Sequence, residues 1–125
     1  MSNFENKKIL IIDDEAGILE TITEILSGLG FKIQTAMDGK TAISTLQKDQ
    51  FDLIISDIAM PQESGMDLVI AFRKMGVETP VVLMSGHYDL SQKVMFSLGI
   101  ADFIKKPFRP TELIEKITKI PSIAN

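Results

Sequence analysis

The amino-acid sequence predicts an α/β fold in which a five-stranded parallel sheet carries helices on both faces. Segments typical of strands alternate with segments typical of helices along the whole chain. Most of the strand-like segments are continuous apolar runs, which is typical of strands buried on both faces. Strict alternation of this kind predicts a parallel sheet with helices packed against it.

Five segments have the composition of strands, and their patterns predict where each one lies. Residues 8–12 (KILII) and 51–56 (FDLIIS) are mostly apolar, and residues 79–85 (TPVVLMS) are similar. Residues 31–36 (FKIQTA) alternate between apolar and polar side chains, as expected for an edge strand. Residues 101–105 (ADFIK) form a short fifth strand. We therefore expect the second strand at an edge and the other four inside the sheet.

Five further segments are predicted to be helices. From Ile18 onward apolar residues recur at helical spacing, and Gly28 and Gly30 end this first helix. Asp38 precedes the second helix as its cap. The second and later helices are predicted over residues 38–49, 65–75, 89–99 and 109–120. The last residues, 121–125, are expected to be loose.

The composition limits the classes of function. A chain of 125 residues has the size of one domain, and its net charge of −4 argues against a nucleic-acid-binding surface, which is usually basic. The chain has no cysteine, which excludes disulfides and thiol chemistry. No apolar run approaches the roughly 18 residues of a membrane span, and the N-terminus lacks the apolar core of a signal peptide. We therefore expect a single cytoplasmic domain, residues 1–125, with no membrane or nucleic-acid partner.

The conspicuous polar side chains follow the ends of the predicted strands. In open α/β sheets, ligands bind beyond the carboxyl ends of the strands, and four strands deliver candidates to that edge. These candidates are Asp13 and Asp14, Asp57, Ser85, and Lys105 and Lys106. Their coincidence at one edge predicts a functional site there.

Three carboxylates, a hydroxyl and an ammonium suggest a particular chemistry. Crowded carboxylates repel one another, which raises their pKa values or recruits a cation. With no cysteine and a single histidine, the cation would be a hard one with oxygen ligands, and Mg²⁺ fits this description. A carboxylate can also act as a nucleophile that takes a phosphoryl group, with the serine and lysine contacting the transferred oxygens.

Each of these groups also has a simpler explanation when it is considered alone. Asp13, Asp14 and Glu15 suit the cap and the charge balance of the first helix. Asp57 suits a turn, and the lysine pair suits a solvated surface. These explanations would all have to coincide at successive strand ends, which favours a shared site.

Four motifs resemble those of the receiver domain of bacterial two-component response regulators, a family that includes chemotaxis receivers. The motifs are ILIIDDE, DLIISDIAMPQESG, VVLMSG and GIADFIKKPF. The resemblance covers residues 6–120 and implies the strand order 2-1-3-4-5. We expect a receiver domain without an attached output domain.

The resemblance implies that Asp57 is the phosphoacceptor and that Mg²⁺ binds beside it. Asp14 matches the direct Mg²⁺ ligand, and Asp13 matches the acid that reaches the ion through water. The backbone carbonyl of Ala59 would be a further ligand, together with Asp57 itself. Mg²⁺ and a lysine would then offset the charge of the phosphoacceptor.

The resemblance also implies which groups respond to phosphorylation. Ser85 matches the switch hydroxyl, and Phe103 matches the switch aromatic, where tyrosine is commoner. Lys106 matches the phosphate-contacting lysine, whereas Lys105 is expected to point into solvent. The bond between Lys106 and Pro107 is expected to be cis, which aims the lysine at the phosphoacceptor.

Two further positions are expected to tune how fast the acyl phosphate hydrolyses. They are Ala59 and His87, which lie two residues after Asp57 and Ser85. For His87, an exposed loop position is the simpler explanation. The apolar run 94–96 on the predicted fourth helix has two explanations, a wide core stripe or a partner-binding patch.

We expect a signalling switch rather than an enzyme that turns over an external substrate, because the chain would catalyse only its own phosphorylation and dephosphorylation. The phosphoryl group would come from a sensor histidine kinase or a phosphotransfer protein. Phosphorylation would alter binding to an unknown downstream protein or promote a dimer. The alternative is a flavodoxin-like small-molecule or enzyme domain, for example a phosphotransferase that turns over a substrate on Asp57. Against it, Ala59 stands where a second acid would be expected, and the sequence has no glycine-rich phosphate loop. A phosphate-independent interaction module is a third reading, against which the intact acids, hydroxyl and lysine argue.

Overall fold

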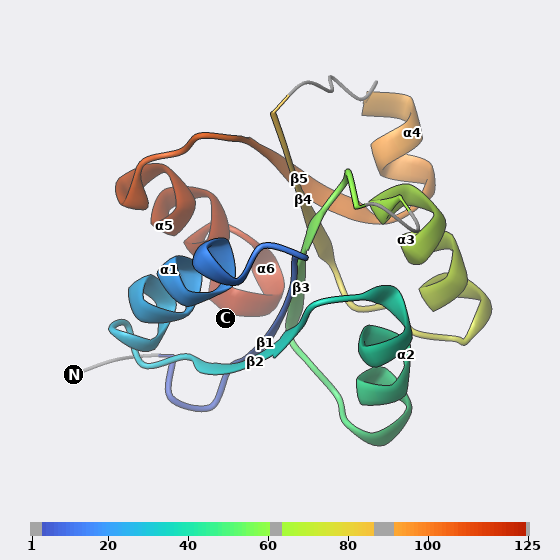
Figure 1. Ribbon diagram of the computed structural model, residues 1–125, viewed down its shortest axis with the longest axis horizontal. Coiled ribbons are helices and arrows are strands. Elements are labelled where there is room, and N and C mark those ends of the chain that lie inside the picture. The colour runs from blue at the N-terminus through green and yellow to red at the C-terminus, as the bar shows by residue number, and fades with distance from the viewer. Residues whose placement is uncertain (1–3, 61–63, 87–91, 125) are drawn as a thin grey trace.

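All five predicted strands are present in the computed structural model, which describes residues 4–60, 64–86 and 92–124 (Figure 1). They form one parallel sheet in the order β2-β1-β3-β4-β5, as the resemblance implied. The strands are β1 (Lys8–Ile12), β2 (Lys32–Ala36), β3 (Leu53–Asp57), β4 (Val81–Ser85) and β5 (Ile100–Lys105).

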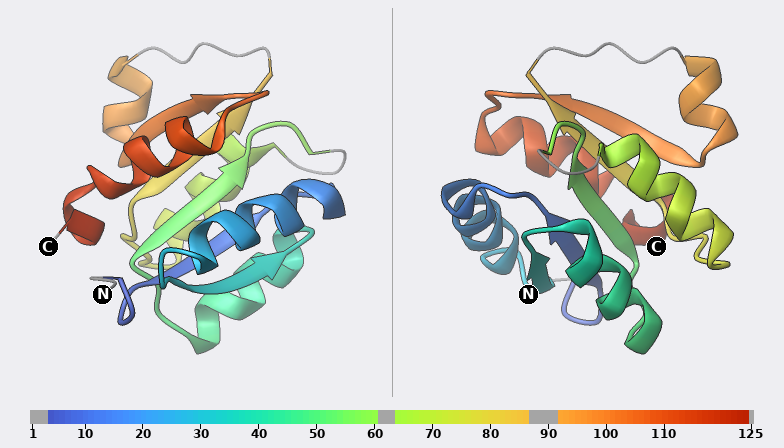
Figure 2. Two further views of the ribbon diagram at one scale, coloured as in Figure 1. Left: turned by 90° about the vertical axis from the view of Figure 1, so that its left-hand side faces the viewer. Right: turned by 45° about the vertical axis from the view of Figure 1, so that its right-hand side comes forward.

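Helices cover both faces of this sheet, as predicted. They are α1 (Ala16–Ser27), α2 (Gly39–Lys48), α3 (Gly65–Lys74), α4 (Gln92–Ser97), α5 (Pro110–Thr118) and α6 (Pro121–Ala124). α1 and α5 lie on one face, and α2, α3 and α4 lie on the other (Figure 1, Figure 2). None of the helices in the described part of the chain combines the length and apolarity that crossing a membrane requires.

Each face of the sheet packs against its helices through a separate apolar cluster. Along β1, Ile9 and Ile11 join the cluster beneath α1 and α5, whereas Leu10 and Ile12 join the cluster beneath α2 and α3. This alternation follows from the two-residue period of a strand. All four side chains are fully buried, which explains why β1 has a continuous apolar sequence.

The two edges of the sheet are β2 and β5. β2 was predicted at an edge from its alternating sequence, and within it only Ala36 is buried. The strand pattern alone had placed β5 inside the sheet, which is wrong, whereas the strand order that the resemblance implied places β5 at an edge, as observed. The sequence of β5 agrees with the observed position, because Ile100 and Ile104 are buried while the other residues are partly or fully exposed.

The termini of the helices agree with several local signals in the sequence. α1 ends at Ser27, and Gly30 in the turn that follows has a positive φ of 100°, which favours glycine. Asp38 caps α2, because its Oδ1 accepts a hydrogen bond from the Thr41 amide at 2.7 Å. The first residues of the predicted fourth helix, 89–91, lie outside the described residues.

The C-terminal segment is docked rather than loose, so the prediction for residues 121–125 is wrong over its described part, 121–124. It forms the short helix α6, in which Ile123 is 1% exposed and joins the cluster beneath α1 and α5. The Ser122 hydroxyl donates to the Asp52 carbonyl at 2.8 Å, and the Lys7 ammonium donates to the Ser122 carbonyl at 2.9 Å. Five residues are too few to show a helical period, and these contacts come from distant parts of the chain.

We predict that Ile123→Ala lowers the free energy of unfolding by roughly 2–5 kcal/mol, since it leaves a cavity under the sheet. Urea unfolding followed by circular dichroism measures this change. The control is Ala124→Ser, which changes an exposed neighbour on the same helix and should leave the midpoint unchanged. Equal midpoints for all three proteins would show that α6 does not stabilise the fold.

Candidate functional site

Four strands deliver polar residues to the same edge of the sheet, as predicted. Asp57 and Ser85 are the last residues of β3 and β4, and Asp13 follows β1 directly. The Asp13 amide donates to the Ala36 carbonyl at 3.1 Å, which ties this residue to β2. The Lys106 amide donates to the Ser85 carbonyl at 2.7 Å, which ties the end of β5 to β4. The register of the sheet therefore places the predicted residues side by side.

Four carboxylates meet at this edge, one more than the sequence analysis grouped together. Oxygen atoms of Asp13, Asp14, Glu15 and Asp57 all lie within 4.8 Å of one another. Asp13 is fully buried and Asp57 is 5% exposed, whereas Asp14 is half-buried and Glu15 is exposed. Glu15 had been considered only for helix capping; it is the N-cap of α1, but its side chain makes no capping hydrogen bond. The unbroken acidic run 13–15 was the signal that could have placed it in the cluster.

Lys106 reaches into the group of carboxylates. Its Nζ lies 2.8 Å from Asp13 Oδ2, 3.5 Å from Asp57 Oδ2 and 3.9 Å from Glu15 Oε1. Its shortest contact is therefore with Asp13, although the sequence analysis had paired it with Asp57. Lys105 is exposed, and the peptide bond between Lys106 and Pro107 is cis, both as expected.

The crowding of charge shifts the pKa values of two groups. Burial and the neighbouring charge of Asp13 raise the pKa of the Asp57 carboxyl, and the Lys106 ammonium and the Ala59 amide offset only part of this effect. Burial alone would lower the pKa of Lys106, but its hydrogen bond to Asp13 and the surrounding carboxylates raise it on balance. Negative charge is thus in excess at this edge of the sheet.

The donor set fits Mg²⁺. All four acidic side chains offer carboxylate oxygens, and two of these side chains are buried. Among the residues that the structure describes, Lys106 supplies the one ammonium within ion-pair distance of these carboxylates. A hard divalent cation prefers oxygen ligands and would remove the remaining excess of negative charge.

The loop after β3 brings backbone groups close to Asp57. The Ala59 amide donates to Asp57 Oδ1 at 3.3 Å, and the Gly65 amide donates to the Ile58 carbonyl at 2.8 Å. A Cβ at Gly65 would lie 2.4 Å from the Asp57 carbonyl oxygen, so only glycine fits at this position. From the sequence, Gly65 is expected only to begin a helix, because a contact of this kind leaves no local signal.

The remaining predicted residues lie close to this edge or along β5. Ser85 is buried and pairs in register with Lys105. Phe103 is partly buried against the cluster beneath α2 and α3. His87 lies outside the described residues.

The apolar run on α4 divides between the core and the surface. Met95 is partly buried and packs against the cluster beneath α2 and α3. Phe96 is 88% exposed, so it does not belong to a core stripe. Nothing in the described residues covers this ring, which leaves the partner-binding explanation open for Phe96.

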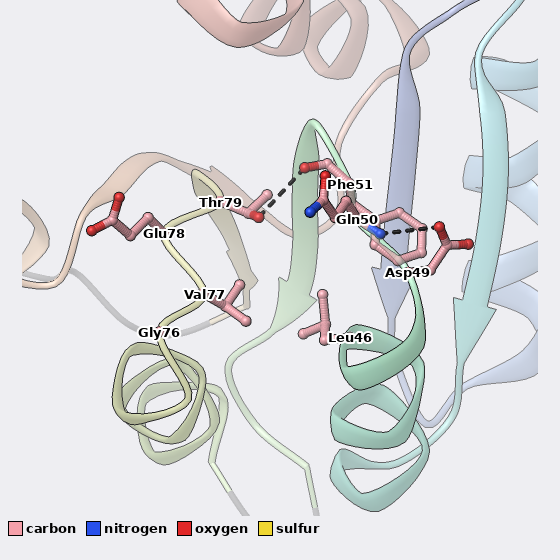
Figure 3. Close-up of a pocket in the computed structure, with 8 residues that line it drawn as sticks. All are labelled: Leu46, Asp49, Gln50, Phe51, Gly76, Val77, Glu78 and Thr79. Carbon is pink, nitrogen blue, oxygen red and sulfur yellow. Dashed lines mark hydrogen bonds between the residues drawn. The ribbon is translucent and has the colours of Figure 1, made fainter.

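Among the described residues, one pocket lies where the strands of the sheet end and another lies where they begin. One, of about 570 Å³, adjoins the carboxylates between α1 and the segment after β5, with Ile18, Lys106 and Phe108 among its lining residues. The other, of about 330 Å³, lies where the strands begin, between α2 and the loop before β4 (Figure 3). Leu46, Phe51 and Val77 give the second pocket its apolar walls. Of these two pockets, the first is next to the candidate site.

Sequence comparison identifies relatives of this chain. It matches the response regulator receiver domain family over residues 9–118. It is 32% identical over 112 residues to the regulatory protein VanRc of Enterococcus gallinarum, and 33% identical over 114 residues to the transcriptional regulatory protein CpxR of Escherichia coli strain K12. Each alignment covers 90% of this chain and 48% of the relative, so the chain spans about half the length of the curated relatives it matches.

Solved structures of similar proteins share the fold over nearly their whole length. The chemotaxis protein CheY4 of Vibrio cholerae is 30% identical with a TM-score of 0.84, covering 91% of this chain and 98% of that one. The response regulator protein TrrA of Thermotoga maritima, in complex with Mg²⁺–BeF, is 33% identical with a TM-score of 0.78, covering 90% of this chain and 97% of that one. Since the family match alone spans most of the sheet and its helices, this chain belongs to the receiver domain family of two-component response regulators.

Proposed function

We propose that this chain is a phosphorylation-dependent signalling switch in which Asp57 accepts the phosphoryl group. The observation that carries the proposal is the position of the Asp57 carboxylate. It lies within 4.8 Å of carboxylate oxygens of Asp13 and Asp14 and 3.5 Å from the Lys106 ammonium. The phosphodonor would be a histidine of a sensor kinase or a phosphotransfer protein, and membership of the receiver family supports this assignment.

Mg²⁺ would be held by Asp13, Asp14, Asp57 and the backbone carbonyl of Ala59. Asp14 would contact the ion directly, and Asp13 would reach it through water. When bound, Mg²⁺ supplies positive charge that offsets the repulsion between these carboxylates and the incoming phosphoryl oxygens. The Mg²⁺–BeF complex of the Thermotoga maritima relative supports this cofactor.

The transfer itself needs a nucleophile and a cation from this chain. An Asp57 carboxylate oxygen would attack phosphorus, and the phosphorus–nitrogen bond of the donor histidine would break, with its electron pair returning to the imidazole. Lys106 would donate to a phosphoryl oxygen, and the distance of 3.5 Å from its ammonium to Asp57 Oδ2 supports this role. The pocket of about 570 Å³ beside Lys106 leaves room for a donor side chain to approach.

The lifetime of the acyl phosphate would depend on the residues that line the approach of water. Ala59 is exposed and follows Asp57 by two residues, so its small side chain leaves this approach open. His87 would have the corresponding role two residues after Ser85. The chain would catalyse only its own phosphorylation and dephosphorylation.

The signal would pass from Asp57 to the surface through Ser85 and Phe103. The Ser85 hydroxyl would donate to a phosphoryl oxygen, and the resulting shift of the backbone after β4 would let Phe103 turn inward. A hydrogen bond to a charged acceptor stabilises by roughly 1.5–3 kcal/mol, which is enough to bias an existing equilibrium. The surface around α4 and β5, where Phe96 and Lys105 are exposed, would then bind a downstream protein or a second copy.

We further propose that residues 1–125 act as one receiver unit in the cytoplasm. The apolar clusters on both faces of the sheet and the docked α6 support a single cooperative unit.

We predict that Asp57→Asn raises the free energy of unfolding by about 1 kcal/mol at pH 7 without Mg²⁺, because it removes a buried carboxylate that its neighbours repel. The pKa of Asp57 is raised in the folded protein, so the folded state binds the proton more tightly and stability falls as pH rises above the ordinary value of 3.8. The gain should therefore shrink as the pH falls toward 3.8 and disappear well below it, where the wild-type carboxyl is protonated in both states.

Urea unfolding with a chelator, at pH 7 and at acid pH, measures this gain. Added Mg²⁺ should stabilise the wild type more than the variant, which reverses the order at neutral pH. A variant less stable than the wild type in chelator at pH 7 would contradict the charge argument.

We predict that Asp14→Ala weakens Mg²⁺ binding by more than about tenfold, since loss of even an outer partner of a metal ligand costs that much. Isothermal titration calorimetry measures the affinity. Glu24→Gln, which removes one exposed negative charge from α1 away from the cluster, is the matched control and should bind normally. Wild-type affinity in the Asp14→Ala protein would sink the assignment of the ligand.

We predict that Ser85→Ala leaves phosphorylation of Asp57 largely intact but uncouples it from Phe103. The measurement is the NMR shift of Phe103 on addition of beryllofluoride and Mg²⁺. Ser27→Ala, an exposed serine at the end of α1, is the control and should show the wild-type change. A full wild-type shift at Phe103 in the Ser85→Ala protein would rule out this coupling.

A further inference from the structure

The pairing of β5 with β4 contains one extra residue. Val81 of β4 pairs with Ile100, whereas the next residue, Val82, pairs with Asp102. Ala101 therefore has no partner across the ladder. An extra residue of this kind is a β-bulge, and it re-aims the side chains that follow it.

The bulge decides on which face of the sheet each later side chain of β5 lies. In a regular strand, Ile100 and Ile104 would share a face, because they are an even number of residues apart. Instead, Ile100 packs in the cluster beneath α2 and α3, and Ile104 packs in the cluster beneath α1 and α5. Phe103 lies on the same side as Ile100, although the two are an odd number of residues apart. The face reverses within the bulge.

Without the extra residue, the wrong lysine would reach the carboxylates. If the pairing advanced regularly from Val81 and Ile100, Ser85 would lie opposite Ile104 instead of Lys105. The amide that donates to the Ser85 carbonyl would then belong to Lys105, not to Lys106. The bulge therefore selects which lysine enters the site.

Two cationic side chains hold the chain on either side of the bulge. Before it, Arg73 of α3 donates from Nε to the Leu98 carbonyl at 2.8 Å and from Nη2 to the Gly99 carbonyl at 3.1 Å. After it, Lys116 of α5 donates to the Phe103 carbonyl at 3.0 Å. The bulge is thus fixed from opposite faces of the sheet.

Arg73 also holds the segment that leads into β4. Its Nη1 donates to the carbonyls of Val77 and Thr79, each at 2.9 Å. These two residues belong to the loop before β4, which forms one wall of the pocket of about 330 Å³ (Figure 3). A guanidinium presents its donors in a rigid planar fork, so a single side chain can fix both strand entries relative to each other.

Gly99, the residue directly before β5, leaves room for the Arg73 guanidinium. Gly99 has a positive φ of 69°, and a Cβ there would lie 3.0 Å from Arg73 Nη2. A larger residue would be strained and would push the guanidinium away.

We propose that Arg73 is a positioning residue for Lys106. Its hydrogen bonds join the segments that lead into β4 and β5 and so maintain the bulge at Ala101. The bulge in turn sets the register that brings Lys106 to Asp13 and Asp57. Arg73 contacts the segments where β4 and β5 begin, whereas the carboxylates lie where the strands end, so Arg73 touches none of the reacting groups. The proposal rests on the proposed function only in its phosphorylation readout.

The test compares Arg73→Met, which removes every donor, with two controls. Lys74→Met makes the same change of charge at the exposed neighbouring position. Val69→Ala weakens the buried face of the same helix but leaves the hydrogen bonds of the Arg73 guanidinium in place. Arg73→Lys keeps the charge but not the fork, and it serves as the test variant if Arg73→Met does not fold.

The first readout is amide hydrogen exchange, which needs neither Mg²⁺ nor a phosphodonor. Arg73→Met should speed exchange of the Lys106 amide about tenfold more than exchange of the Leu10 amide in β1, because only the first depends on the register of β5. Val69→Ala should change both amides by the same factor, and Lys74→Met should change neither. Equal factors for the two amides in Arg73→Met, or in Arg73→Lys where that is the test variant, would overturn the proposal.

The second readout is the rate of phosphorylation by acetyl phosphate with saturating Mg²⁺. Arg73→Met should lower the rate constant by about tenfold, as expected for a misplaced contact to the reacting group, and both controls should keep it. A wild-type rate in the Arg73→Met protein would overturn the proposal. A wild-type protein that takes up no phosphoryl group would instead overturn the proposed function, and the exchange comparison would still decide the role of Arg73.

Discussion

The burial of like charges at one edge of the sheet is the constraint on which the rest of this structure depends. Asp13 and Asp57 lose almost all contact with water at the ends of adjacent strands, and this burial, together with the charge of Asp13, raises the pKa of Asp57. Lys106 compensates only part of that charge, since its closest partner is Asp13 at 2.8 Å. Such a site costs stability in the absence of a cation, so it persists only where the surrounding fold fixes it. The buried strands, the close approach of Gly65 and the ladder between β4 and β5 supply that rigidity.

Much of this arrangement could be predicted from the sequence, because its signals are local. The continuous apolar run of β1 reflects side chains buried on both faces, and the alternating run of β2 reflects an edge. Asp38 was identifiable as a cap because capping needs only a short polar side chain before a helix. The acids at the strand ends could be grouped because parallel strands all end at one edge of the sheet. Their roles as ligands or nucleophile came from the resemblance to a family, since spacing alone left simpler explanations open.

The features that the sequence did not predict depend on contacts between distant residues. The docking of Ile123 depends on an apolar cluster that the sheet and two helices build together. Glu15 joins the carboxylates only because the turn into α1 brings it back toward them. The bulge at Ala101 is invisible in the sequence, because it is a property of the pairing between two strands. Each of these features is set by tertiary packing, which overrides the local pattern.

The two ends of the strands differ in physical character. This division explains how one small domain can hold a site of buried like charges. The end of the sheet where the strands finish concentrates negative charge and adjoins a pocket that is open to a donor. The end where the strands begin is held by hydrogen bonds. The Ser122 hydroxyl of α6 donates to a carbonyl there, and the Arg73 guanidinium donates to four carbonyls that precede β4 and β5. Because a strand is stiff along its length, a register that is fixed where two strands begin is also kept where they end. The chemistry at Asp57 therefore depends on hydrogen bonds made at the far end of the strands beside it.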